Sequence, residues 1–290
     1  MNVVVLDIGG TNTRIARVSE RLNIEEEIEI KSGKSLEEFM SIVEHIRKIM
    51  NEGTKKIGIA VAGAVDYKEK MLKKSPNLPF LNNFSFLKIE ENVCIPLFLE
   101  NDANAAAFGA SRRFNLSHIV YITLGTGIGG GVVIDNEILR GYQGYAGEIG
   151  HITVVPFGKR CSCGNRGCLE AYTGGWALQR EINKKWKNKT VKDLFDLAKE
   201  NRKARRMVRC FSTFLGIGVA SLINIFNPQA IIFGGKMSYS YPYFCDKMKE
   251  VVKRRSYLPS NVQFIRDPLP DKAGLLGMAY IALEGKVWKR

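Results

Sequence analysis

Short apolar runs rich in β-branched residues alternate along the chain with longer segments of helical periodicity. Runs that predict buried strands lie at residues 2–7, 14–18, 24–30, 56–63, 94–100, 118–124, 130–134, 229–233 and 262–265. Segments that predict helices lie at residues 35–50, 102–108, 176–186, 191–199, 204–226, 241–255 and 273–283. Strands that alternate with helices in this way are typical of an α/β protein.

Two glycine-rich turns each join two of the predicted strands. Gly9-Gly10-Thr11 follows the first strand, and Gly125-Thr126-Gly127 lies in the middle of the chain. The second turn, with Gly130, formally matches the dinucleotide fingerprint G-x-G-x-x-G. That fingerprint requires a helix after the turn, whereas residues 132–134 continue as a strand. Two strand–turn–strand units therefore predict an internal duplication of α/β domains rather than a dinucleotide fold.

The length of 290 residues is sufficient for two domains of ordinary size. We predict a small N-terminal domain over residues 1–115, with the closing helix 273–290 packed on it. A larger domain is predicted over residues 116–272, carrying the cysteine-rich segment and a nucleotide site. The N-terminus has no basic segment of a signal peptide, and the longest apolar run, 215–226, is too short to cross a bilayer. We therefore expect a cytoplasmic protein with no membrane partner.

The formal net charge of +14 comes from 43 basic and 29 acidic residues. The positive charge is concentrated at residues 184–189, 202–209 and 247–255, all in predicted helical stretches. A solvated helix surface explains such runs, and attraction of an anionic substrate such as a nucleotide is a second interpretation. Neither interpretation requires a nucleic acid as partner.

Four side chains that bind soft metals fall within residues 148–170. They are His151, Cys161, Cys163 and Cys168, and this donor set suits a closed tetrahedral Zn²⁺ site. Glu148 and Glu170 bracket the four ligands. The segment is predicted either to present polar side chains to a hydroxyl-rich substrate or only to support the fold.

The three cysteines outside this segment are Cys94, Cys210 and Cys245. They lie in apolar surroundings, so we expect buried free thiols. Such usage fits a reducing compartment.

The glycine turns are candidate phosphate-binding loops, because backbone N–H groups without a nearby Cβ can approach phosphate oxygens. Hydroxyls of Thr11, Thr13 and Thr126 and the charge of Arg14 would add to such a site. Asp7, at the end of the first strand, is placed to hold Mg²⁺ through water. Gly234-Gly235 forms a third glycine site, which favours a nucleotide over two ordinary hairpins.

Asp102 follows a predicted strand and begins a predicted helix. A carboxylate in this place is either a general base or the helix N-cap. The neighbouring amide of Asn101 favours a site for a polyol.

Seven motifs occur in one order along nearly the whole chain. They are DIGGTNTR (7–14), SPNLP (75–79), ENDANAAAFG (100–109), LGTGIGGG (124–131), GYAGEIGH (144–151), CSCGNRGCLE (161–170) and NPQAIIFGG (227–235). With these motifs the chain resembles the ROK family of bacterial sugar kinases and repressors, within the actin/hexokinase/Hsp70 superfamily. The resemblance implies two actin-like (RNase H-like) α/β domains flanking a cleft, with a structural zinc loop.

The resemblance also implies a function, a set of ligands and their residues. The implied reaction is ATP-dependent phosphorylation of a hexose at its 6-hydroxyl, with Mg²⁺ and Asp102 as general base. The implied sugar ligands are Asn77, Asn101, Asp102, Glu148, His151 and Glu170. The implied zinc ligands are His151, Cys161, Cys163 and Cys168. The implied nucleotide-binding residues are Asp7, Gly9, Gly10, Thr11, Asn12, Thr13, Arg14, Gly125, Thr126, Gly127, Gly234 and Gly235. A homodimer is expected as well.

The choice of hexose stays open, with glucose expected first, allose next, and other hexoses and N-acetylated amino sugars after them. A sugar-responsive repressor is an alternative, but we expect no DNA-binding module ahead of the first glycine turn, since Asp7 comes only six residues after Met1. An ATPase acting on protein partners is a third class, against which the cysteines and polyol-type residues argue. Zinc is expected to influence sugar binding more than ATP binding, on the premise that neither glycine turn contacts the zinc segment.

Overall fold

The computed structural model describes residues 1–257 and 261–285, and it divides into two compact units. The first unit comprises residues 1–115, 136–146 and the C-terminal segment from Lys272. The second comprises residues 116–135 and 147–271. The segment 136–146, which contains β11 (Glu137–Ile138), thus groups with the first unit, whereas we had assigned it to the second domain. The last five residues of the predicted closing helix, 286–290, lie outside the described residues.

The first unit is built on a sheet with the order β3-β2-β1-β4-β8. Its strands are β1 (Asn2–Ile8), β2 (Asn12–Ser19), β3 (Ile24–Lys31), β4 (Thr54–Val61) and β8 (Leu97–Asn101). β1 pairs antiparallel with β2 and parallel with β4, which is in turn parallel to β8. Val4 and Leu6 belong to one hydrophobic cluster and Val3 and Val5 to another, so β1 is buried on both faces. This explains its continuous apolar sequence.

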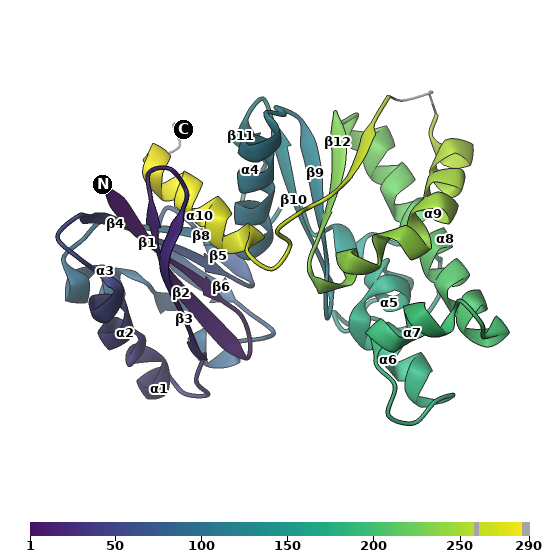
Figure 1. Ribbon diagram of the computed structural model, residues 1–290, viewed down its shortest axis with the longest axis horizontal. Helices are drawn as coiled ribbons and strands as arrows, with labels where there is room; N and C mark the ends of the chain where they lie inside the picture. Colours follow the sequence, from purple (N-terminus) through teal and green to yellow (C-terminus); the bar gives the residue numbers. More distant parts are fainter. Residues whose placement is uncertain (258–260, 286–290) are drawn as a thin grey trace. The chain divides into compact units, whose positions relative to one another are not determined.

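Helices supply the apolar side chains of each cluster. One cluster includes α1 (Leu36–Met40), α2 (Ile42–Ile49) and α3 (Leu87–Val93); the other includes α4 (Asp102–Phe114) and α10 (Ala273–Glu284). α10, in yellow in Figure 1, packs against α4. A Cβ on Gly109 of α4 would lie only 2.6 Å from the Cα of Gly277 on α10. Small residues at this crossing therefore allow the two backbones to approach closely.

Some parts of the first unit differ from the prediction. The helix predicted over residues 35–50 starts with Ser35 as N-cap but breaks into two helices at Ser41. The helix α3 was not predicted, nor was the small antiparallel sheet of β5 (Ala64–Asp66), β6 (Met71–Lys74) and β7 (Phe84–Ser85). The proline-rich loop contains the 3₁₀ turn η1 (Pro79–Leu81). These elements are short, so apolar periodicity gives little signal for them.

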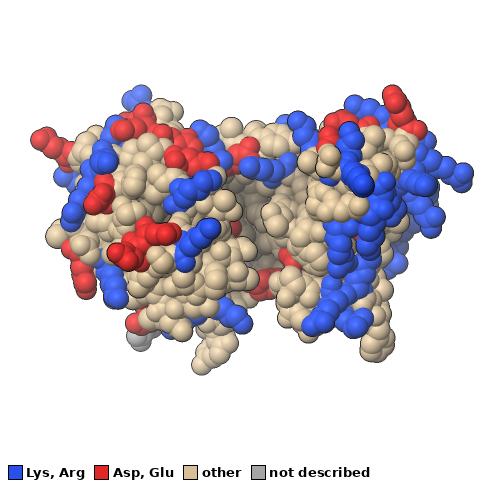
Figure 2. All heavy atoms as spheres, turned by 90° about the horizontal axis from the view of Figure 1, so that it is seen from below, with Lys and Arg blue, Asp and Glu red and all other residues tan. Residues whose placement is uncertain are grey.

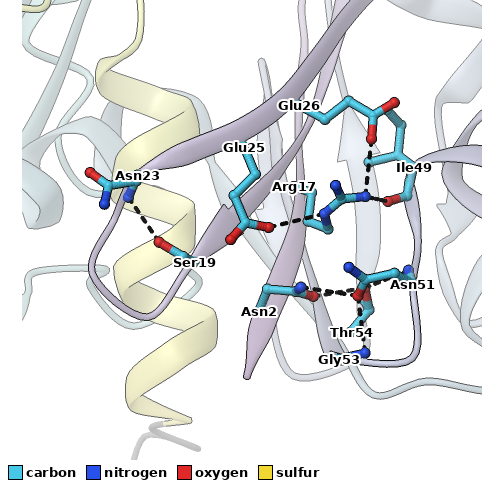
Figure 3. Close-up of polar contacts among 10 residues, drawn as sticks. All are labelled: Asn2, Arg17, Ser19, Asn23, Glu25, Glu26, Ile49, Asn51, Gly53 and Thr54. Carbon is cyan, nitrogen blue, oxygen red and sulfur yellow. Dashed lines mark hydrogen bonds and ion pairs between the residues drawn. The ribbon is translucent and has the colours of Figure 1, made fainter.

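Polar contacts of one arginine join α2 to the strands β2 and β3 (Figure 3). The guanidinium of Arg17 on β2 pairs with Glu25 and Glu26 of β3. It also donates to the carbonyl oxygen of Ile49 at 2.6 Å, which satisfies one of the last carbonyls of α2.

The second unit repeats the strand arrangement of the first. β9 (Ile119–Leu124) pairs antiparallel with β10 (Ile128–Ile134) and parallel with β12 (Ala230–Gly234), which pairs parallel with β13 (Gln263–Arg266). Both glycine turns join antiparallel strands, so the predicted duplication of strand–turn–strand units is confirmed.

Helices and 3₁₀ turns make up much of the remainder of the second unit. They are η2 (Ile149–His151), α5 (Glu170–Thr173), α6 (Gly175–Asn183), α7 (Val191–Leu197), α8 (Arg202–Phe226), η3 (Lys236–Ser240) and α9 (Tyr241–Arg255). α8 packs against α5, α7 and α9. Rings of Phe195, Phe211, Phe233 and Phe244 contact one another and join α7, α8, β12 and α9 into one core.

The helix α8 also has the length and apolar composition of a membrane span. Its 25 residues include an apolar window of which 56% is buried inside the protein. The buried residues face α5, α7 and α9, so the hydrophobicity of α8 is accounted for by the core of the second unit.

The prediction that the remaining cysteines are buried was wrong. Cys94 and Cys210 are exposed, and Cys245 is only partly buried. Cys94 ends α3 in a left-handed conformation with φ 55°, and Cys210 lies on α8 but is not among its buried residues. Apolar neighbours in the sequence did not indicate on which side of each helix these residues lie.

Candidate functional site

Two carboxylates come together at one edge of the sheet in the first unit. Asp7 on β1 is level with Ala60 on β4, and Ala60 is level with Glu100 on β8, so the strand ends that carry Asp7 and Asp102 are close. Burial, and then repulsion by Asp102, raise the pKa of Asp7 to about 7, while Arg14 lowers it in part. A carboxyl under these conditions gains from a nearby cation, which fits the expected Mg²⁺.

Asn101 rather than Asp102 caps the helix that begins at the end of β8. The side-chain oxygen of Asn101 accepts hydrogen bonds from the N–H groups of Ala103 and Asn104, at 2.9 and 3.1 Å. Its amide nitrogen donates to the carbonyl of Gly63 at 3.0 Å. The alternative interpretation of Asp102 as an N-cap is therefore wrong, and its carboxylate does not serve as the cap of α4.

The first glycine turn lies beside the proline-rich loop. A Cβ on Gly10 would be 2.9 Å from the Cβ of Asn77, so the loop packs directly over this glycine. Asn77, Gly10 and Thr11 are all exposed. Thr13 is different: it is fully buried, and its hydroxyl oxygen is 2.9 Å from that of Ser32. Its side chain thus stabilises the turn from inside.

The polar side chains that follow this turn are held by β3. Asn12 donates to Glu29 Oε1 at 2.6 Å, and the Nε of Arg14 donates to Oε2 of the same carboxylate at 3.0 Å. Glu29 thereby orients two of the residues predicted to bind nucleotide.

The second glycine turn is attached to the start of α6. The carbonyls of Gly125 and Thr126 accept from the N–H groups of Gly175 and Trp176, at 3.0 and 2.9 Å. The backbone N–H of Gly125 donates to the carbonyl of Gly127 at 3.1 Å. These contacts fix the shape of the turn.

The Gly234-Gly235 site lies at the end of β12, at the same edge of the second unit's sheet as the turn that follows β9. Gly234 pairs with Thr123, one residue before the end of β9. Gly235 has φ 72°, and a Cβ there would be 2.5 Å from the carbonyl oxygen of Leu124. Glycine is required here by the backbone conformation and by close packing, whatever else the site binds.

The predicted soft-metal ligands form one cluster. One donor atom from each of His151, Cys161, Cys163 and Cys168 lies within 4.8 Å of all the others. The sulfurs of Cys163 and Cys168 are 3.8 Å apart, and Nδ1 of His151 is 3.7 Å from the sulfur of Cys161. Two sulfurs bound to one tetrahedral Zn²⁺ at about 2.3 Å are roughly 3.8 Å apart, so the donor set and spacing both fit this ion.

The charge on these thiols explains why a cation would stabilise the cluster. Burial, followed by the neighbouring thiols of Cys163 and Cys161, raises the pKa of Cys168 to about 12. Full deprotonation of all three thiols is therefore unfavourable unless a cation is bound between them.

Glu170 connects the second glycine turn to the cysteine segment. Its side chain is buried, and Oε1 accepts from the Ser162 hydroxyl at 2.8 Å and the Trp176 indole at 3.0 Å. Its Oε2 accepts from the N–H of Ile128 at 2.9 Å and would be 2.5 Å from a Cβ on Gly127. The premise that neither glycine turn contacts the zinc segment was therefore wrong.

The other residues of the GYAGEIGH motif lie on the outer side of the cluster. His151 turns Nδ1 toward the thiols, and its Nε2 is 3.9 Å from Oε2 of Glu148. The side chain of Glu148 is 63% exposed. Nε2 of His151 and the Glu148 carboxylate therefore face away from the thiols.

Sequence reasoning missed a buried ion pair beside Asp102. Glu100 is 3% exposed and pairs with Arg140, which is 8% exposed and comes from the segment 136–146. The other oxygen of Glu100 accepts from the N–H of Asn101 at 3.0 Å. Glu100 belongs to a motif that was recognised, but no pattern connects it with an arginine forty residues later.

Comparisons with known proteins agree on one family. The sequence profile described as "ROK family" matches residues 3–285. The xylose repressor of Bacillus spizizenii is 37% identical over 237 residues, which cover 79% of this chain and 61% of the repressor. The chain thus spans about three fifths of the length of that relative.

Two kinases match over nearly the full length of both chains. The glucokinase of Thermotoga maritima is 33% identical over 314 residues, 98% of each protein. The crystal structure of a ROK family glucokinase from Streptomyces griseus in complex with glucose and AMPPNP is 31% identical, with a TM-score of 0.84. It covers 98% of this chain, which in turn covers the whole of that structure.

Proposed function

Because the chain belongs to the ROK family, we propose that it is an ATP-dependent sugar kinase that phosphorylates a hexose at its 6-hydroxyl. The observation that supports the proposal is that the carboxylates of Asp7 and Asp102 lie close together at one edge of the sheet, beside the exposed turn at Gly10. Asp102 would serve as the base and Asp7 would hold the cation, next to backbone that a phosphate could approach.

In the proposed reaction Asp102 accepts the proton of the sugar hydroxyl as its oxygen attacks the γ-phosphate of ATP in line. The bond from that phosphorus to the bridging oxygen breaks, and ADP leaves. Asp7 would hold Mg²⁺ through water, and this ion would neutralise charge on the phosphates. Backbone N–H groups of the glycine turns would stabilise the transferring phosphoryl group.

The sugar ligands follow from the family motifs. We propose Asn77, Asn101 and Asp102 from the first unit and Glu148, His151 and Glu170 from the second. Asn101 has one N–H left for this role, because its oxygen caps α4 and its other N–H donates to the carbonyl of Gly63. Oε1 of Glu170 accepts from Ser162, Trp176 and, at 3.9 Å, the Cys161 thiol, whereas Oε2 accepts from Ile128 N–H, so Oε2 is the oxygen that can accept from a sugar hydroxyl.

We propose that His151, Cys161, Cys163 and Cys168 hold one structural Zn²⁺. A metal-bound Nδ1 would fix the tautomer of His151 and leave Nε2 as a hydrogen-bond donor. Glucose is our first choice of substrate and allose the second. A homodimer and a cytoplasmic location are further parts of the proposal, and light scattering after gel filtration tests the first of these.

A coupled assay of ADP release across glucose, allose, mannose, fructose and an N-acetylated amino sugar tests the function. Asp102→Asn should lower turnover by roughly 10²- to 10⁴-fold, because the amide accepts no proton. Asp66→Asn, a change of a partly exposed carboxylate in the same unit, should leave turnover unchanged. Near-normal turnover of the Asp102 variant would refute its role as base.

A sugar-responsive repressor is the second candidate, favoured by the 37% identity to the xylose repressor. Such a protein would bind sugar without releasing ADP. Absence of ADP release with every hexose, together with sugar binding measured by calorimetry, would favour this candidate over the kinase.

A further inference from the structure

A cavity in the second unit is lined by none of the residues assigned to sugar, nucleotide and zinc, although its Tyr172 packs against Cys161 and Cys168. Its volume is about 450 Å³, and it is lined by parts of α5, α6 and α8 together with Lys159. Pockets of about 300–1,000 Å³ are of the size that holds small organic molecules. The described residues thus include a second place where such a molecule could bind.

The buried part of the cavity lining is apolar, and the exposed side chains at its mouth are cationic. Leu178 and Phe211 are buried there, and the ring of Phe214 packs on that of Tyr172 with centroids 4.3 Å apart. The cations at the mouth are Lys185, Lys203 and Arg206, all exposed. An apolar body would fit the floor, and a negative group would meet the cations.

These cations form no close ion pair with any described residue. Within the described residues, Lys185, Lys203 and Arg206 have no carboxylate within ion-pair distance. Glu181, the single carboxylate of the lining, is engaged by Lys184 at 3.2 Å and by Lys159 at 3.7 Å. Positive charge at the mouth therefore remains available to a ligand.

Further basic residues around the cavity extend its region of positive charge. A neighbouring cavity of about 520 Å³ shares Lys185 and Lys203 and adds Lys184 and Arg202. The second unit carries 22 Lys and Arg against 11 Asp and Glu, so +11 of the net charge of +14 belongs to it. Figure 2 shows a band of Lys and Arg side chains on this part of the molecule.

We propose that this cavity binds a small organic anion with an aromatic or aliphatic body and a carboxylate, sulfonate or phosphate group. A second copy of the chain is disfavoured as occupant, because a symmetric contact through this face would place its cations against the same cations. The proposal is independent of the proposed kinase reaction, since no residue of the cavity takes part in it.

Two matched dyes test the proposal on the intact protein. The anionic 8-anilinonaphthalene-1-sulfonate should bind with saturation at one site per chain. The neutral N-phenyl-1-naphthylamine has a similar body without the sulfonate, and it should bind about tenfold or more weakly. Added salt should weaken only the anionic dye. Equal affinity of the two dyes, or no saturable site, would overturn the proposal.

Variants locate the site. Lys203→Gln with Arg206→Gln should weaken the anionic dye by about five- to twentyfold, as expected for two partly screened charge contacts. Lys253→Gln with Arg254→Gln changes two exposed cations of α9 outside the lining and should have little effect. An equal effect of both pairs would show nonspecific attraction to the basic surface and refute the site.

Cys210 provides a reporter inside the cavity, because it is exposed and belongs to the lining. The bound anionic dye should slow alkylation of Cys210 by iodoacetamide, as followed by peptide mass spectrometry. Cys94, exposed in the first unit, is the internal control and should react at an unchanged rate. Unchanged alkylation of Cys210 at saturating dye would contradict the proposal. Protection that instead grows with protein concentration would identify a second chain as occupant.

Discussion

Replacing Arg140 by methionine tests most directly how the end of β8 and the start of α4, where Asp102 lies, are stabilised. The guanidinium donates through Nε to Glu100 Oε2 at 2.8 Å and lies 4.4 Å above the ring of Tyr67. The other oxygen of Glu100 accepts from Asn101 N–H at 3.0 Å and from Asn104 Nδ2 at 3.1 Å. One carboxylate therefore joins the segment 136–146 to the start of α4.

The magnitude follows from burial. Glu100 and Arg140 are 3% and 8% exposed, so Arg140→Met leaves a carboxylate without its cation in a place that water hardly reaches. Loss of one partner of a buried pair costs about 3–5 kcal/mol of unfolding free energy. Arg254→Met breaks a solvent-exposed pair with Glu250, 74% and 41% exposed, and should cost at most about 1 kcal/mol.

Hydrogen exchange read by mass spectrometry is the suitable assay, because it separates the two units. Amides of α4 should lose protection in Arg140→Met, whereas those of α8 should keep theirs. The double variant Glu100→Gln with Arg140→Met should regain most of the loss, since the amide oxygen still accepts hydrogen bonds and no charge is buried. Unchanged protection of α4, or a double variant as unstable as the single one, would refute this account of the pair.

Three further changes test other parts of the site. Asp7→Asn should raise the melting temperature more at pH 8 than at pH 5. Burial raises the pKa of Asp7 from 3.8 to about 7, so between about pH 4 and 7 only the unfolded chain releases this proton and the folded state loses stability as the pH rises; the loss is complete above pH 7, and asparagine removes it. An equal shift at both pH values would contradict it. The Cys163→Ala variant should lose about one zinc per chain, as measured by elemental analysis, and should melt at a lower temperature. Its KM should rise for both sugar and ATP. A wild-type protein that is metal-free yet fully active would exclude the zinc site. Glu170→Gln should raise KM for ATP, because an amide cannot accept from Ile128, Ser162 and Trp176 together; a change in sugar KM alone would contradict the proposed support of the glycine turn.

The structure also changes how one obvious variant would be interpreted. From the sequence alone, Gly127→Val is expected to block the approach of a phosphate to the turn, because it adds a Cβ. A Cβ at Gly127 would be 2.5 Å from Glu170 Oε2, so the substitution would first displace Glu170. Effects of this substitution on the binding of sugar and of nucleotide could therefore not be told apart. Glu170→Gln tests the support of the turn more directly.

The sequence by itself determined strands β1–β4, β8–β10, β12 and β13, the glycine turns and the set of metal-binding side chains. Each depends on local information: β-branched runs for strands such as β1, a Gly-Thr-Gly turn between two such runs, and four soft donors within 18 residues. Motif order along the chain was enough to predict the ROK family, which the comparisons confirm. Patterns of this kind depend only on residues that are close together in the sequence.

Only the tertiary structure decided which side chains of the site form hydrogen bonds or ion pairs with distant residues of the chain. Asn101 caps α4 although Asp102 has equal capping chemistry, because the direction in which β8 ends places the oxygen of Asn101 over the first N–H groups. Glu170 is tied to Ile128, a contact across 42 residues, and Glu100 to Arg140 across 40. Contacts between residues so far apart in the chain depend on how strands and loops pack, and no local sequence pattern contains that information.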